Sequence, residues 1–146
     1  MKKFFCFLVI CFVAAATGFA QTADSVEALL NTEAASYEQA AAFILEAAGV
    51  SGFSNPEEAF GLAAERKWLP SDVSGKDIAR VDNVSLLVMK ALALKGGLFY
   101  SLFQNAHYAY RELQDREMID VNTGPGRTVS GEILLFLIDR AMNNEQ

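Results

Sequence analysis

The stretch VDNVSLLVMKAL at residues 81–92 places apolar side chains at its first, fourth, seventh, eighth, eleventh and twelfth positions. Two other stretches keep small or apolar residues at the same spacing: YEQAAAFILEAA at residues 37–48 and GEILLFLIDRAM at residues 131–142. This spacing follows the 3.6-residue period of an α-helix and gathers the apolar side chains into one stripe. The sequence therefore predicts three equivalent amphipathic helices, which must bury their stripes against one another.

The stripes belong to a longer internal repeat. Residues 55–92 align with residues 105–142 at an offset of 50 positions, and residues 35–48 align with the second half of that unit at an offset of 44. A polar stretch divides each complete copy, at residues 70–77 and 120–127, so each copy is expected to form helix, loop and helix. Repetition at this period is typical of small helical repeat proteins, which often act as binding devices.

Short-range signals set the expected helix boundaries. Ser36 and Gln39 can form a capping box, Asn55 followed by Pro56 suits a helix start, and Gly49 suits a helix end. We expect helices at residues 36–48, 56–68, 81–94, 106–118 and 130–142. The predicted fold class is all-α, a compact bundle of helix-loop-helix repeats without a sheet. It should form a single domain over residues 35–142, between a lead-in at 21–34 and a tail at 143–146.

The first 20 residues have the features of an export signal. Two lysines precede an apolar run at residues 4–16, and Gly18 and Ala20 stand three positions and one position before the expected cleavage point. We therefore expect a mature protein that begins at Gln21 and lies in the periplasm or on the cell surface. The alternative is an uncleaved anchor, although the run is short for a membrane span of about 20 residues. Both cysteines lie in this segment, so the mature chain would have no disulfide and no thiolate metal site.

Charge limits the partners that the mature chain can have. Without residues 1–20 it carries 10 basic and 18 acidic side chains, a net charge of −8. Nucleic acid and anionic lipid are bound by clusters of Lys and Arg, and the mature sequence contains no such cluster. We therefore expect neither as a partner. No second apolar segment approaches membrane-spanning length, so no transmembrane anchor is expected after cleavage.

The repeat resembles the S-layer homology module, an anchoring repeat of the bacterial cell envelope. In that family a first helix with an aromatic–Ala start leads through a Gly/Asp-rich loop to a second helix, which opens with a Thr-Arg-Ala-Glu-like tetrad. The corresponding tetrads here, at residues 35–38, 79–82 and 129–132, read ASYE, ARVD and VSGE. The first helices carry Ala59-Phe60 and Tyr108-Ala109-Tyr110. The resemblance covers residues 35–142 and implies a pseudo-threefold bundle of three modules.

The resemblance also implies where a ligand would bind. In the family the tetrad arginine contributes to binding an anionic cell-wall glycan. Here Arg80 alone occupies that position, because the other two copies carry Ser36 and Ser130. The implied ligand residues are Arg80, Asp82, Ser130, Glu132 and, three positions early, Arg127. The alternative for Arg80 is a salt bridge with Asp77 or Glu38, or plain exposure to solvent.

Two aromatic features have both a structural and a functional interpretation. Trp68 is expected to plug the bundle, since its equivalent is the apolar Met118, and the alternative is stacking on a sugar ring. Residues 98–103 read LFYSLF after two glycines and interrupt the repeat. We expect a buried connector there. The alternative is an exposed surface that binds a partner through Phe99, Tyr100 and Phe103.

The sequence shows no recognisable catalytic constellation. His107 is the only histidine, and the mature chain offers no cysteine or second histidine to complete a zinc site with it. We expect no enzymatic activity, no cofactor and no metal. The predicted function is an exported binding module for cell-wall polymer or another envelope protein. The alternatives are a periplasmic adaptor that binds an envelope protein through residues 98–103 and, less favoured, an unrecognised hydrolase.

Overall fold

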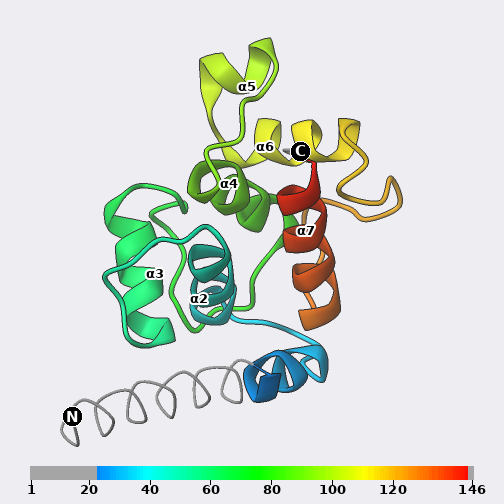
Figure 1. The fold of residues 1–146 in the computed structure, drawn as a ribbon. Coiled ribbons are helices and arrows are strands. Elements are labelled where there is room, and N and C mark those ends of the chain that lie inside the picture. The colour runs from blue at the N-terminus through cyan, green and yellow to red at the C-terminus, as the bar shows by residue number, and fades with distance from the viewer. Residues whose placement is uncertain (1–22, 145–146) are drawn as a thin grey trace, which may run out of the picture.

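The computed structural model describes residues 23–144 (Figure 1). Its named helices are α2 (Tyr37–Ala47), α3 (Pro56–Glu65), α4 (Val81–Ala91), α5 (Leu98–Phe103), α6 (Ala106–Asp115) and α7 (Gly131–Asn143). Residues 23–30 are helical as well, and extended pairing within the described range is limited to two isolated bridges. The all-α fold and the five predicted helices are confirmed, and α5 is an addition to them. The predicted export signal lies outside the described residues.

Helices α3, α4 and α6 end three residues before their predicted ends, for a shared reason. The residue after each C-cap is left-handed, with φ of 57° at Lys67, 52° at Ala93 and 59° at Glu117. The next residue donates its N–H to a carbonyl five positions earlier, as in the 2.9 Å bond from Met118 to Leu113. These are the closing bonds of a Schellman motif. In α2 the left-handed residue is Gly49, so the sequence marks that helix end more clearly than the others.

A ring of three backbone hydrogen bonds relates the three repeats. Ala35 donates its N–H to the carbonyl of Val129 at 2.8 Å, Val129 donates to Ala79 at 2.9 Å, and Ala79 donates to Ala35 at 2.8 Å. The three residues open the three tetrads, and all are buried. The ring brings the starts of α2, α4 and α7 together around one centre. This is the arrangement expected of a pseudo-threefold bundle.

Hydrogen bonds that run in the opposite cyclic order cap the starts of these helices. At the start of α4, the N–H groups of Val81 and Asp82 donate to the carbonyls of Arg127 and Pro125, both at 3.0 Å. The loop ahead of α4 caps α2 in the same way, and the lead-in ahead of α2 supplies a carbonyl to α7. Because the first N–H groups of a helix have no partner within it, each repeat completes the helix start of a neighbour.

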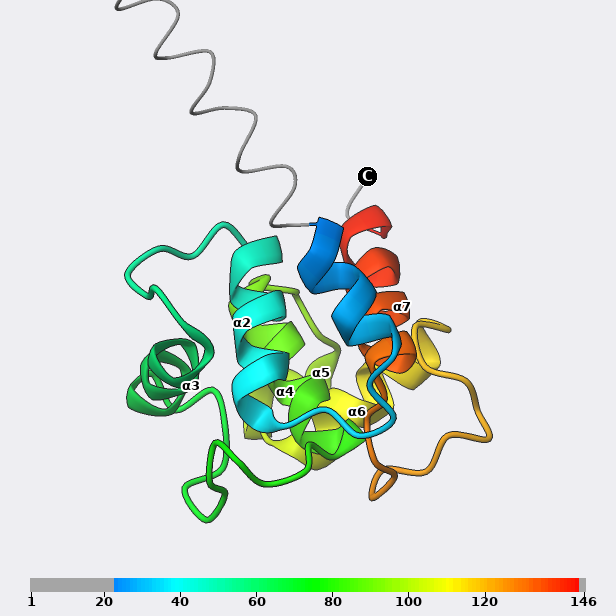
Figure 2. The same cartoon turned by 90° about the horizontal axis from the view of Figure 1, so that it is seen from below.

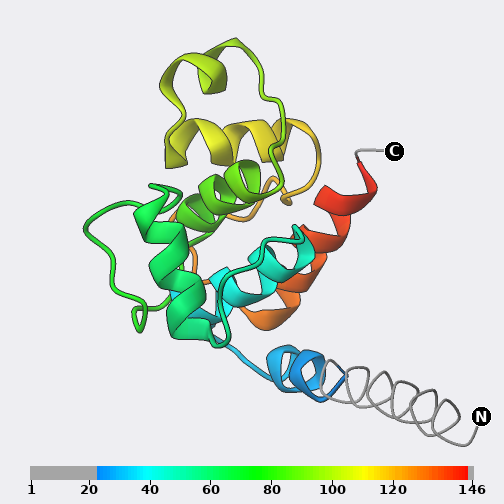
Figure 3. The same cartoon turned by 60° about the vertical axis from the view of Figure 1, so that its left-hand side comes forward.

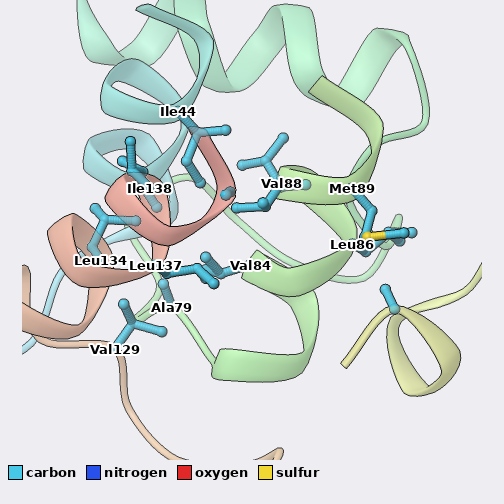
Figure 4. Packing of buried hydrophobic residues seen from close by; sticks show 14 of the residues in the cluster. Ile44, Ala79, Val84, Leu86, Val88, Met89, Val129, Leu134, Leu137 and Ile138 are labelled. Carbon is cyan, nitrogen blue, oxygen red and sulfur yellow. The ribbon is translucent and has the colours of Figure 1, made fainter. Parts of the chain in front are cut away.

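The three stripes meet in one hydrophobic core (Figure 4). Ile44 of α2, Val84 and Val88 of α4, and Leu134 and Leu137 of α7 are each at most 2% exposed. Helix α3 packs on α2, and α6 packs on α4, so each first helix covers the second helix that precedes it in the chain. This arrangement buries one stripe per helix, as the sequence pattern requires.

Residues 23–30 fill one interface of the ring, beside α7 (Figure 2). Leu29 is 2% exposed, and its carbonyl oxygen would lie 1.7 Å from a Cβ added to Gly131. Gly131 also donates its N–H to the carbonyl of Thr32 at 2.9 Å. Position 131 therefore needs glycine because a backbone approaches it closely, whereas the equivalent positions carry Tyr37 and Val81.

Helix α5 accounts for the change in repeat offset. Residues 48–55 connect α2 to α3, and the corresponding connection from α4 to α6, residues 92–105, is six residues longer. Helix α5 is itself six residues long. It lies beyond α6, at the end of the molecule opposite residues 23–30 (Figures 1 and 3). It is thus an insertion into an otherwise regular repeat.

Candidate functional site

One buried side chain anchors α5 to the bundle. Tyr100 is 6% exposed, and its ring lies so close to Gly96 that an added Cβ there would come within 2.3 Å of Cδ1. Burial, and to a smaller extent the negative charge of Glu112, raises the pKa of the Tyr100 phenol above its usual value. The phenol is therefore held in its neutral form, as suits an anchoring residue.

A charged network holds the connection ahead of α5. The Oε2 atom of Glu112 accepts the N–H of Gly97 at 2.8 Å, and its Oε1 atom accepts from Nε of Arg116 at 2.9 Å. Arg116 also donates to the carbonyl of Lys95. Leu62 occupies the position equivalent to Glu112 in the other complete copy. The network is thus specific to the copy that carries the insertion.

The outer face of α5 is apolar and exposed. It consists of Leu98, Phe99, Leu102 and Phe103, which are 71%, 63%, 67% and 56% exposed. Phe99 and Phe103 both stack on Tyr108, with ring centroids 5.9 and 5.1 Å away and interplanar angles of 11° and 20°. The stacking fixes the two rings in place while more than half of each stays open to solvent.

These positions correct the prediction for residues 98–103. The buried connector is wrong for the outer face of α5 and holds for Tyr100 alone. Phe99 and Phe103 are exposed, as the alternative requires, but Tyr100 points into the bundle and cannot form part of the same surface. Leu98 and Leu102 complete the surface, although the sequence did not single them out.

The surroundings of α5 differ in charge from the rest of the chain. Residues 83–111 contain Lys90, Lys95 and Arg111 but neither Asp nor Glu, in a chain with 18 acidic residues. Arg111 and Asp115 help to line a groove of about 410 Å³ between α5 and α6. The stretch of chain that carries the exposed apolar face therefore has no acidic side chain of its own, whereas α6 contributes both Arg111 and the acidic Glu112 and Asp115 to the groove.

The ligand residues implied at the tetrads are arranged differently from the expectation. Arg80 pairs with Asp82 at 2.8 Å, and not with Asp77 or Glu38, while its side chain remains 54% exposed. The first two N–H groups of α4, which could attract an anion, already donate to loop carbonyls. An anion at this helix start would therefore depend on the Arg80 side chain, which would first have to leave Asp82.

The other implied residues have structural roles or are exposed. The Oγ atom of Ser130 caps α7 by accepting the N–H of Ile133 at 3.2 Å, and Glu132 and Arg127 are exposed. Trp68 is half-buried, so it plugs the bundle only in part, and the guanidinium of Arg66 lies 4.9 Å from its ring centroid. Arg80 and Asp82 are therefore the members of the implied site that interact directly.

The sole histidine lies at the edge of the aromatic cluster. His107 is exposed and meets Tyr108 edge-on, with centroids 5.1 Å apart. Within residues 23–144, no group of three or more His, Cys, Asp or Glu side chains is placed to hold a metal ion. Among the helices of the same range, none combines the length and the apolar character that a membrane span requires.

Comparison of the chain with protein-family models, with curated proteins and with solved structures finds no match.

Proposed function

We propose that this protein is an exported, non-catalytic binding module of the cell envelope, and that it docks onto an envelope protein through the outer face of α5. One observation carries the proposal. A six-residue insertion in a regular repeat presents four large apolar side chains to solvent. Export rests on the sequence of residues 1–20.

The bundle does not need the exposed apolar face of α5 in order to connect its helices. The shorter connection at residues 48–55 makes the equivalent link between helices without such a face. Burying one Leu or Phe side chain stabilises a protein by about 1.5–3 kcal/mol. A partner that covered all four side chains, which are 56–71% exposed, would gain roughly 4–8 kcal/mol, before the entropic costs of association. Contiguous exposed apolar patches of this kind mark interaction sites.

The chemistry of the surface favours a protein over a wall polymer. The outer face of α5 offers methyl groups and aromatic rings, and rigid aromatic side chains are typical anchors at the centre of protein interfaces. The helix starts, where the glycan was expected, are already closed by loop carbonyls. The charged side chains beside α5 are of both signs, since Arg111, Glu112 and Asp115 line the groove between α5 and α6. The partner that fits best is therefore a protein with an apolar groove that receives the outer face of α5.

Site-specific photo-crosslinking tests the proposal. A photoreactive residue replaces Leu102, on the outer face of α5, and in a control protein it replaces Ile78, which is 57% exposed elsewhere on the molecule. Irradiation of cells should give one dominant protein adduct from position 102 and none of that mass from position 78. The partner is then identified and purified, and its affinity is measured directly.

A double variant tests whether the outer face of α5 contributes to the free energy of binding. Leu98→Ser with Leu102→Ser removes exposed apolar area without touching the stack on Tyr108, and should weaken binding of the purified partner by at least about thirtyfold. Ile78→Ser should leave the affinity unchanged. Binding to purified sacculi or to lipid vesicles is measured in parallel. If position 102 gives no protein adduct while sacculi capture the wild type and the α5 variant equally, the proposal fails.

A further inference from the structure

A second recess lies away from α5, beside the start of α7. It has a volume of about 200 Å³, and seven of its ten lining residues are apolar, among them Val81, Met118, Ile133 and Phe136. The polar residues of the lining are Asp120, Thr123 and Glu132. No residue of α5 contributes to it, so it is separate from the surface that we propose for the envelope protein.

The repeat explains why this position is hollow. At the equivalent place between α2 and α4, Tyr37 is 1% exposed and its hydroxyl accepts a hydrogen bond from Nδ2 of Asn83 at 2.7 Å. One repeat further on, Val81 replaces Tyr37 and Ile133 replaces Asn83, and both of these side chains line the recess. Valine is smaller than tyrosine, and isoleucine cannot form the hydrogen bond. At the remaining equivalent position, Gly131 is covered by residues 23–30. Of the three sites, the one at Val81 is left open.

A dedicated polar contact holds the wall of the recess in place. The hydroxyl of Tyr110 donates to the carbonyl of Thr123 at 2.7 Å and accepts from Nε2 of Gln114 at 3.0 Å. The equivalent residues in the other complete copy are Phe60 and Ala64, which cannot make these bonds. The loop around Thr123 is therefore tied to α6, and the tie opposes collapse of the loop into the recess.

The lining defines the ligand by size and charge. A cavity of about 150 Å³ with apolar walls is large enough to bind benzene, so this recess suits a phenyl or branched alkyl group. Asp120 and Glu132 are exposed carboxylates, and the lining includes neither Lys nor Arg. Arg140 lies beside one lining residue, with its guanidinium 4.9 Å from the ring centroid of Phe136.

We propose that this recess is a binding site for a small apolar group that carries an ammonium. The apolar group enters between Val81 and Ile133, and the ammonium meets the carboxylates of Asp120 and Glu132. Such chemistry can come from a free aromatic or branched-chain amine, or from the amino terminus of a peptide that begins with an apolar residue.

The test is an NMR titration of the whole mature protein with matched probes. Benzylamine, benzyl alcohol and benzoate share one ring and differ in charge. Benzylamine should shift the amide signals of residues 118–123 and 132–137 saturably, and benzyl alcohol should bind about twofold to fivefold more weakly, as expected for exposed charges. Benzoate should bind more weakly still. Phe-Gly-Gly amide and its N-acetyl form distinguish a free amine from the amino terminus of a peptide as the ligand. If the ligand is the amino terminus of a peptide, Phe-Gly-Gly amide should bind more tightly than benzylamine.

Two variants complete the design. Val81→Tyr with Ile133→Asn rebuilds the Tyr37–Asn83 pair inside the recess and should abolish the shifts. Asp120→Asn with Glu132→Gln alters two exposed side chains, so it should fold normally and bind benzylamine and benzyl alcohol equally. The absence of saturable shifts, shifts that survive in the folded rebuilt protein, or benzoate binding equal to that of benzylamine would each overturn the proposal. If the rebuilt protein does not fold, the carboxylate variant still decides the matter.

Discussion

Gly131→Ala probes the closure of the threefold ring, because its added Cβ would meet backbone. The Cβ would lie 1.7 Å from the carbonyl oxygen of Leu29, and no side-chain rotation can relieve such a contact. Residues 23–30 must therefore move away from α7. The cost includes the burial of Leu29, about 1.5–3 kcal/mol, and the hydrogen bond from Gly131 to Thr32, about 0.5–1.5 kcal/mol. The better helix propensity of alanine offsets up to about 1 kcal/mol of this.

We therefore expect Gly131→Ala to lower the free energy of unfolding by about 2–3 kcal/mol. For a domain of this size, that corresponds to a fall in Tm of about 5–15 °C. Urea unfolding followed by Trp68 fluorescence gives the free energy, and hydrogen exchange shows whether protection is lost first at residues 23–32. The matched control is Gly61→Ala, because a Cβ at Gly61 meets nothing within 4 Å. This substitution should stabilise α3 by about 0.5–1 kcal/mol. A Gly131→Ala protein with wild-type stability and wild-type protection would refute the reasoning.

Three further predictions follow from particular contacts. Glu117→Gly relieves a left-handed residue (φ 59°) and should raise stability by about 0.5–1 kcal/mol, as measured by urea unfolding; an unchanged or lower value would contradict it. Arg80→Ala breaks an exposed ion pair and should change stability by less than about 1 kcal/mol, and if the glycan interpretation is right it should also weaken sacculus binding at least about tenfold. Because burial and Glu112 raise the pKa of Tyr100, the unfolded chain should lose this proton first as the pH rises past about 10. The stabilisation that the Tyr100 proton gives is thus present below about pH 10 and is lost as the pH rises further. Between about pH 9 and about pH 11.5, which bracket the usual pKa of tyrosine, Tyr100→Phe should therefore show a smaller fall in Tm than the wild type.

The sequence predicted the bundle because its main determinant is local. Stripes at residues 37–48, 81–92 and 131–142 place the core on one side of each helix, and capping residues such as Asn55 and Ser36 fix the helix starts. The ends of α3, α4 and α6 were less predictable. Lys67, Ala93 and Glu117 take up a conformation that glycine normally signals, and the residue after each of them closes the helix end with a backbone hydrogen bond.

The candidate sites were harder to predict because they depend on differences between copies. The sequence showed that residues 98–103 interrupt the repeat, but periodicity cannot tell a six-residue helix with an exposed face from a buried connector. The recess was missed altogether. Its signal was present in the pair of replacements at Val81 and Ile133, which becomes meaningful only once the structure shows Tyr37 bonded to Asn83.

Accessibility of a single cysteine in the envelope tests the central claim, that a partner covers the outer face of α5. Both native cysteines lie within residues 1–20, so a chain cleaved before Gln21 contributes no competing thiol. Leu102→Cys and, as a control, Ile78→Cys are labelled with a maleimide in the purified protein and in intact envelopes. We predict full labelling of both purified proteins, and protection of position 102 alone in the envelope. Equal labelling of position 102 in the two settings would contradict the account.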